Sequence, residues 1–180
     1  MRLLAFLATV AVAAIPASAQ VGRLPAGTTV LAGPGATTKP GLGWHLNVRH
    51  RVLAVPLDSL PGFLSGLSGS LTLSADGYYQ RGLVNDGSPW LLGSGLASRW
   101  DPAPEGWAVR PYFIPLSVGV FVEGLAFSDG LRPALGIGNG IGVEVPIGAA
   151  ALTVEGRAVR LYTSDGEKAG TAPFSVGVRF

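Results

Sequence analysis

The sequence has no cysteine, few charged residues and only one long apolar run. Without cysteine the chain can form no disulfide, and it cannot carry a lipid on an N-terminal cysteine. Charged residues make up 13% of the chain, whereas soluble domains average about 25%. The 13 basic and 11 acidic residues form no basic cluster, which argues against nucleic-acid binding. This composition disfavours an ordinary soluble domain.

The apolar run lies at the N-terminus and predicts a secretory signal peptide. Arg2 precedes an uncharged stretch from Leu3 to Ile15, and Ala17-Ser18-Ala19 forms an A-x-A cleavage site. The stretch is shorter than the ~20 apolar residues that a membrane-spanning helix needs. We therefore expect residues 1–19 to be a cleaved signal peptide and residues 20–180 to form the exported domain. An exported chain with little charge and no second apolar run is typical of a membrane β-barrel.

Strands explain the rest of the chain better than helices, because 27 glycines and 14 prolines interrupt it and no helical stripe is visible. Turns are predicted by proline-containing segments at 56–61 and 101–106 and by four Asp-Gly pairs: Asp76-Gly77, Asp86-Gly87, Asp129-Gly130 and Asp165-Gly166. They separate eight predicted strands, at residues 23–33, 42–54, 65–79, 90–100, 107–122, 133–146, 149–163 and 172–180. A barrel chain with both ends in the periplasm crosses the membrane an even number of times, and this parity supports the weak first strand.

The predicted fold is therefore all-β, an eight-stranded antiparallel up-and-down transmembrane β-barrel. The connections expected at its outer end are short, at about 33–41, 80–89, 123–132 and 164–171. Loops of this size can contact a partner, but they contain no recognisable motif, and no extracellular partner is identified by them.

Bulky aliphatic residues alternate with small or charged residues along these strands. Between residues 135 and 145, for example, Leu135, Ile137 and Ile141 oppose glycines and Glu144. The aliphatic side faces inward in a soluble lipocalin-like binder of apolar ligands, and outward in a membrane barrel. The other side carries Gly, Ser and Thr with few charges, and the only two lysines fall in predicted loops, so it suits a narrow interior better than a solvated surface. We expect the aliphatic side to face lipid.

Charged residues on the minor face are predicted to lie in the lumen. These residues are Arg49, Arg51, Asp76, Arg99, Arg110, Glu144, Glu155, Arg157 and Arg179. Opposite charges enclosed together can neutralise one another as a structural filling. The alternative is a narrow, gated ion path, whereas a porin for large solutes is disfavoured because eight strands leave room mainly for side chains.

Aromatic residues fall near the predicted strand ends, as expected of the two interfacial girdles of a membrane barrel. Trp100, Trp107 and Phe180 are assigned to one rim, and Tyr78, Trp90 and Tyr162 to the other, together with Phe121 and Phe127. The alternative is that they are ordinary core aromatics.

These features resemble the small eight-stranded outer-membrane β-barrel proteins of bacteria, the class that includes the OmpA transmembrane domain and OmpX. The resemblance rests on the signal peptide, LGIGNGIGVEVPIG, LTVEGRAVRLY and the terminal SVGVRF, and it departs from the class in the weak first strand. It implies an outer-membrane location, outer-membrane lipid as the surroundings, and a C-terminal signal for the barrel assembly machinery. That signal would comprise Phe174, Val176, Val178 and Phe180.

No catalytic, cofactor or metal site is predicted. His45 and His50 lie on opposite faces of one strand and cannot converge on one metal ion. The glycine run at 136–142 lacks GxGxxG spacing and precedes no predicted helix, so it does not indicate a nucleotide site. Some barrels of this class modify lipid A with a rim histidine and serine, but no His-x-Ser arrangement is present near His50.

The expected function is therefore a structural or surface role without enzyme activity, with a small ion channel, an adhesin, a soluble binder and a lipid-A-modifying enzyme as alternatives.

Overall fold

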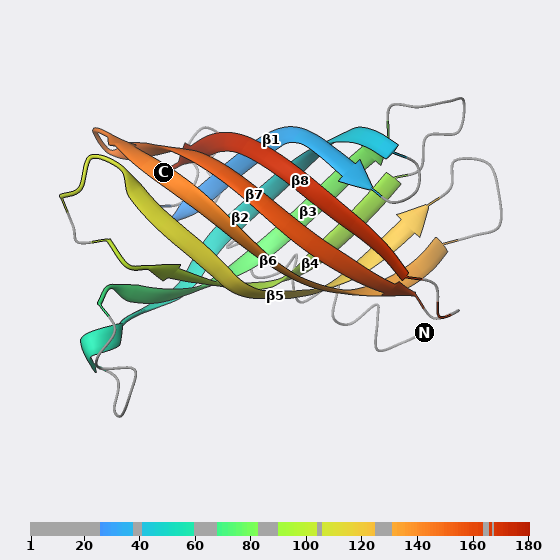
Figure 1. Cartoon of the computed structure of the whole chain (residues 1–180), viewed down its shortest axis with the longest axis horizontal. Helices are drawn as coiled ribbons and strands as arrows, with labels where there is room; N and C mark the ends of the chain where they lie inside the picture. The colour runs from blue at the N-terminus through green and yellow to red at the C-terminus, as the bar shows by residue number, and fades with distance from the viewer. Residues whose placement is uncertain are drawn as a thin grey trace.

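The computed structural model is a closed barrel of eight antiparallel strands (Figure 1). It describes residues 26–37, 41–59, 68–82, 90–103, 106–124, 131–163, 166 and 168–180. The strands are β1 (Thr28–Thr37), β2 (Gly41–Pro56), β3 (Ser70–Gly82), β4 (Trp90–Asp101), β5 (Arg110–Gly124), β6 (Leu131–Ile147), β7 (Ala150–Thr163) and β8 (Lys168–Arg179). A 3-10 turn, η1 (Leu57–Ser59), follows β2. The predicted fold class is confirmed.

The barrel closes where β8 pairs with β1. Thr29 is opposite Arg179, and Ala32 is opposite Val176. Beyond the strand itself, the Phe180 amide donates to the Thr28 carbonyl at 2.9 Å, and the Gly27 amide donates to the Phe180 carbonyl at 2.6 Å. The terminal residue is therefore held by backbone hydrogen bonds to the start of β1.

The strand bounds differ from the prediction mainly at the ends. β1 runs to Thr37 because its residues pair in register with β2 up to Gly41, so the first strand lies four to five residues further along the chain than predicted. β8 begins at Lys168, within a predicted loop. The predicted turn at Asp76-Gly77 is wrong, because both residues pair inside β3, with Arg49 and Val48 of β2. Residues 1–25, including the predicted signal peptide, lie outside the described residues, as do Asp86-Gly87 and Asp129-Gly130.

The two ends of the barrel carry different connections. The β2–β3, β4–β5 and β6–β7 connections and the C-terminus lie together at one end, on the left in Figure 1, which we call the inner end. They comprise residues 57–69, 102–109 and 148–149. The opposite, outer end carries the connections 38–40, 83–89, 125–130 and 164–167, each of which has seven residues or fewer. Among the described residues, no helix is long and apolar enough to span a membrane.

The exterior of the barrel is apolar over most of its described surface. Along β6, Leu135, Ile137, Ile141, Val143 and Val145 are exposed and alternate with inward residues. Exposed apolar side chains on the other strands include Trp44, Leu46, Val48, Leu92, Leu96, Phe113, Val118, Leu152, Phe174 and Val176. The buried residues include arginines, glutamates, serines and threonines, which is the reverse of a soluble protein.

Glycines on the inner face make room for aromatic rings that fill the lumen. A Cβ at Gly136 would lie 2.2 Å from the Phe121 ring, and one at Gly93 would lie 2.3 Å from the same ring. On β6, a Cβ at Gly142 would lie 2.3 Å from the Tyr112 ring. The glycine run of β6 thus allows side chains of neighbouring strands to cross the narrow interior.

Candidate functional site

The middle of the lumen holds four charged side chains from three strands, which we call the central network. Arg49 on β2 binds Glu155 on β7 in a bidentate pair, with nitrogen–oxygen distances of 2.7 and 3.0 Å. Arg49 Nε also donates to Asp76 on β3 at 2.9 Å. Arg157 completes the ring, since its Nε donates to Glu155 and its Nη1 donates to Asp76, each at 2.6 Å. Each carboxylate is therefore shared by both arginines.

A second group near the inner end forms the inner-end network. Arg99 on β4 donates through Nη1 to Glu144 on β6 at 2.6 Å and through Nε to Asp101 at 2.8 Å. Arg179 on β8 pairs with the other oxygen of Glu144 at 3.0 Å. This network also contains two arginines and two carboxylates, so its formal charges cancel.

Tyr112 on β5 connects the two networks. Its hydroxyl donates to Glu155 of the central network at 2.6 Å. Its ring lies under the guanidinium of Arg99 in the inner-end network, with Arg99 Cζ 3.8 Å from the ring centroid. Such cation–π contacts contribute about 0.5–2 kcal/mol, more when they are desolvated. Sequence reasoning did not identify Tyr112 or Asp101, although each lies two residues from a predicted lumen arginine, Arg110 and Arg99 respectively, and so shares its face.

The central network is shielded from solvent, whereas the side chains of Asp101 and Arg179 in the inner-end network are 24% and 31% exposed. The side chains of Arg49 and Glu155 are 4% and 1% exposed. Buried charges are tolerated only when they are paired and their remaining donors and acceptors are satisfied. Every carboxylate oxygen of the central network contacts an arginine, so the charges of this network neutralise one another.

The outer half of the lumen is closed by an apolar cluster. Its buried members are Tyr78, Leu91, Phe121, Ala134, Val159 and Leu161. The rings of Tyr78 and Phe121 meet edge to face, with their centroids 5.9 Å apart. Beside them, the Tyr78 hydroxyl and Thr171 donate to the same oxygen of Gln80, at 2.5 and 2.7 Å.

His45 lies beside the apolar cluster and contacts the last strand, β8. Its Nε2 is 2.7 Å from the Ser175 hydroxyl, and its ring stacks on Tyr78 with centroids 5.8 Å apart. His45 is fully buried, whereas His50 is half-buried and its Nδ1 is 3.1 Å from the Thr28 hydroxyl. The two histidines therefore have different surroundings, and in the described part of the chain no group of histidines and carboxylates could hold a metal ion.

The nine predicted lumen residues are not all brought together. Arg49, Asp76, Glu155 and Arg157 form the central network, and Arg99, Glu144 and Arg179 belong to the inner-end network. Arg110 is opposite Glu144 in the register, and its Nε is buried without a hydrogen-bond partner within the described ranges. Arg51 is exposed near the start of β1, where its side chain lies against Gly27.

The girdle assignments need two corrections. Tyr78 and Phe121 are buried in the lumen, because they share the parity of the inward residues Asp76 and Ser117 on their strands. Trp107, Tyr162 and Phe180 are exposed, and Trp90 and Trp100 are half-buried on the outward parity of β4. Phe127 lies outside the described residues.

On the last strand, Phe174 and Val176 are exposed on the exterior, Val178 is half-buried there, and Phe180 follows the strand. The four side chains thus form one outward row along the strand that closes the barrel.

The fold is similar to that of known outer-membrane proteins. The crystal structure of Neisserial surface protein A (NspA) matches with a TM-score of 0.65 and 16% sequence identity, over 84% of this chain and 94% of that chain. The crystal structure of the outer membrane enzyme PagL matches with a TM-score of 0.60 and 16% identity, over 84% of this chain and 98% of that chain. No protein-family model matches the sequence, and neither does any curated protein. At these identities the likeness establishes the fold.

Proposed function

We propose that this chain, whose fold is that of the small eight-stranded outer-membrane β-barrels, is an integral outer-membrane protein with a sealed lumen and a structural or surface role. The single observation that carries the proposal is the combination of an apolar exterior with an interior of paired charges. An exterior of this kind is stable in hydrocarbon, because a closed antiparallel barrel has no open strand edge.

The orientation of the side chains opposes the soluble alternative. A lipocalin-like binder needs an apolar interior with space for a ligand, whereas this interior contains two ion networks and a packed ring cluster. The exposed aliphatic side chains would also form a continuous apolar surface in water, which soluble monomers rarely tolerate.

The packed lumen favours a structural role over conduction. Arg49 and Arg157 hold both carboxylates of the central network, and the Tyr78–Phe121 ring pair lies beyond them toward the outer end. An ion moving along the axis would have to break several charge-assisted hydrogen bonds and displace these rings. We therefore favour a closed barrel over a small ion channel.

The short outer connections favour a structural role over adhesion. Assuming that the inner end lies in the periplasm, the connections exposed to the outside are those at 38–40, 83–89, 125–130 and 164–167. Outer-membrane barrels usually carry their longer loops outside. Here the longest connection, 57–69, follows β2 at the inner end, and the outer connections have at most seven residues each.

The proposed role is non-catalytic. His45 and Ser175 have the spacing that nucleophilic catalysis requires. Both are buried in the lumen, however, so a lipid substrate outside the barrel would not reach them. Unchanged lipid A after expression of the protein in an outer membrane is the expected result, and the appearance of a deacylated or acylated species would reverse this assignment.

We also propose that the outward row of Phe174, Val176, Val178 and Phe180 is the signal for the barrel assembly machinery. Its side chains lie on the outward face of β8, and the backbone edge of the strand is open until β8 pairs with β1. Deleting Phe180 should reduce the amount of folded barrel in the outer membrane, since the terminal backbone bonds to Thr28 and Gly27 are also lost.

Membrane fractionation and single-channel recording together test the proposed function. The protein should sediment with the outer membrane and resist extraction by high salt or alkali, because its membrane contacts are apolar. Refolded protein in a planar bilayer should give no steady conductance steps. Recovery in the soluble periplasmic fraction would reject the membrane location, and reproducible conductance would reject the sealed lumen.

A further inference from the structure

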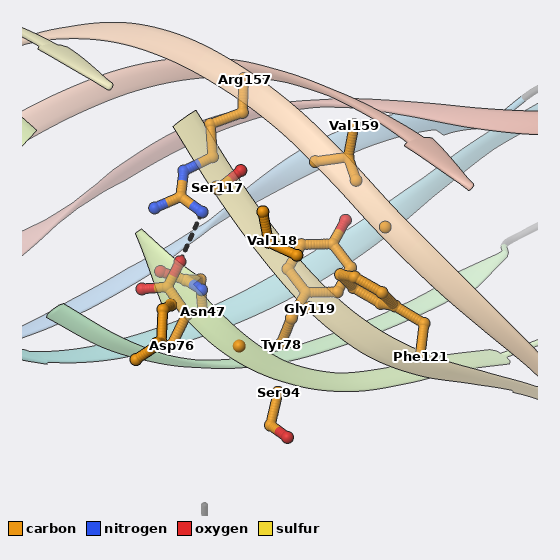
Figure 2. A pocket seen from close by; sticks show the side chains of 13 residues that line it. Asn47, Asp76, Tyr78, Ser94, Ser117, Val118, Gly119, Phe121, Arg157 and Val159 are labelled. Carbon is orange, nitrogen blue, oxygen red and sulfur yellow. Dashed lines mark hydrogen bonds and ion pairs between the residues drawn. The ribbon is translucent and has the colours of Figure 1, made fainter. Parts of the chain in front are cut away.

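A small cavity lies between the central network and the apolar cluster (Figure 2). Its volume is about 30 Å³. Asn47, Asp76 and Arg157 line its polar side, while Tyr78, Phe121 and Val159 line its apolar side. Figure 2 shows the Arg157 guanidinium and the Asp76 carboxylate joined across the polar side, with the Phe121 ring opposite.

Two of these residues have a buried polar atom that lacks a hydrogen-bond partner. Asn47 is 4% exposed, and its Nδ2 donates to the Gly77 carbonyl at 3.0 Å, which leaves Oδ1 unpaired. The Arg157 side chain is 8% exposed, and its Nε and Nη1 are paired while Nη2 is not. A buried polar atom without a partner costs about 1–3 kcal/mol. One unpaired acceptor and one unpaired donor thus belong to residues that line the same cavity, and a ligand that can both donate and accept would satisfy them.

We propose that this cavity is an internal water site, in which an ordered water donates to Asn47 Oδ1 and accepts from Arg157 Nη2. A cavity needs roughly 10–15 Å³ of space that a water-sized sphere can occupy in order to hold one water. The site is therefore large enough for one or two waters and too small for an organic solute. This site goes beyond the proposed role of the barrel, because it depends only on the interior.

The charges around the cavity favour water over an ion. Arg49 and Arg157 are balanced by Asp76 and Glu155, so the surroundings are formally neutral. An anion would satisfy Arg157 but would face the Asp76 carboxylate and leave the Asn47 oxygen unpaired. A cation would satisfy Asn47 but would face the guanidinium. Only a neutral donor and acceptor satisfies both atoms.

The Phe121 ring separates this site from the outer end. It is fixed against Gly93 and Gly136 on the two neighbouring strands, where an added Cβ would lie 2.3 and 2.2 Å away from the ring. It also meets the Tyr78 ring edge to face. The proposed water site thus lies beneath these two rings.

A crystal structure of the refolded full-length mature protein, grown with sodium bromide at a resolution that shows ordered waters, tests the site. The expected result is a water peak within hydrogen-bond distance of both Asn47 Oδ1 and Arg157 Nη2, without anomalous signal. An anomalous bromide peak there would replace the water site with an anion site. An empty cavity would overturn the proposal.

A pair of variants tests it in solution by nuclear Overhauser contacts between water and backbone amides. Asn47→Leu removes the acceptor and should abolish the water contacts of the amides around the cavity. Asn139→Leu makes the same chemical change on the exposed face of β6 and should leave them intact. Persistence of the contacts in Asn47→Leu would contradict the assignment, and the crystal result on the unaltered protein decides the matter if that variant does not fold.

Discussion

Replacing Glu155 with glutamine is the sharpest test of the central network. Glu155 accepts four hydrogen bonds, two from Arg49, one from Arg157 and one from Tyr112, at distances between 2.6 and 3.0 Å. Glu155→Gln keeps the size of the side chain but removes its charge. Arg49 and Arg157 are then opposed only by Asp76, and the glutamine Nε2 directs its hydrogens at other donors.

The expected cost is about 3–5 kcal/mol of unfolding free energy, because breaking a buried pair leaves an uncompensated charge. The assay is urea unfolding of protein refolded into lipid vesicles, followed by the fluorescence of the four tryptophans. Tyr112→Phe removes a single hydrogen bond to the same carboxylate and should cost less, about 1.5–3 kcal/mol.

A double variant separates charge balance from lost contacts. Glu155→Gln combined with Arg157→Gln leaves Arg49 paired with Asp76, so the site is neutral again. Its destabilisation should fall below the sum of the two single variants by about 0.5–3 kcal/mol. If Glu155→Gln alone cost less than ~1 kcal/mol, as an exposed ion pair would, the network would be solvated and the reasoning for a sealed lumen would fail.

Three further stability measurements use the same assay. Leu96 lies on the exterior of β4 in mid-strand, opposite Val118, and is 51% exposed, so Leu96→Arg should lower the free energy of unfolding by about 2–4 kcal/mol. Val109 is 50% exposed beside the inner rim, so Val109→Arg should lower it by only about 0–1 kcal/mol. Equal costs would argue against a lipid-facing exterior. Gly136→Ala drives a methyl into the Phe121 ring and should cost about 1–3 kcal/mol. Gly156→Ala meets no atom within 4 Å and should be nearly neutral, so a reversed order would refute the packing role of the glycines. Ser175→Ala leaves buried His45 Nε2 without its partner and should cost about 1–3 kcal/mol, more than Ser98→Ala on the exterior.

The serine prediction concerns a weak point in the barrel closure. The paired positions of β1 and β8 stop at Ala32–Val176 and resume at Gly35–Pro173. Pro34 and Pro173 have no backbone N–H to donate there. The His45–Ser175 contact crosses from β2 to β8 over this interval, at 2.7 Å. A side-chain contact therefore holds the strands together where the backbone ladder is incomplete.

Alternation of side chains predicted the strands and their two faces, and the small, weakly charged residues of the minor face predicted that the aliphatic face points outward. Leu135, Ile137 and Ile141 are exposed as the pattern indicates, since a strand buries every second residue in a narrow barrel. Asp76-Gly77 was misleading because the dipeptide that favours a turn also suits a lumen position, where Asp76 pairs with Arg49 and Arg157. The choice between these two uses depends on strands that are distant in sequence.

The interior partners were harder to predict for the same reason. Arg49 and Glu155 are 106 positions apart, and His45 and Ser175 are 130 apart. Pairing them requires the register of four strands, which turn signals do not determine. Tyr78 and Phe121 were misassigned because closeness to a strand end suggested the interface, while their parity placed them inside.

The separate neutrality of the two ion networks has a consequence for how this sequence can diverge. A change of charge at Asp76 can be compensated at Arg49 or Arg157, but not at Arg99, whose partners are Glu144 and Asp101. Substitutions in homologues should therefore covary in two independent blocks. Position 112 should covary with both blocks, because Tyr112 contacts Glu155 through its hydroxyl and Arg99 through its ring.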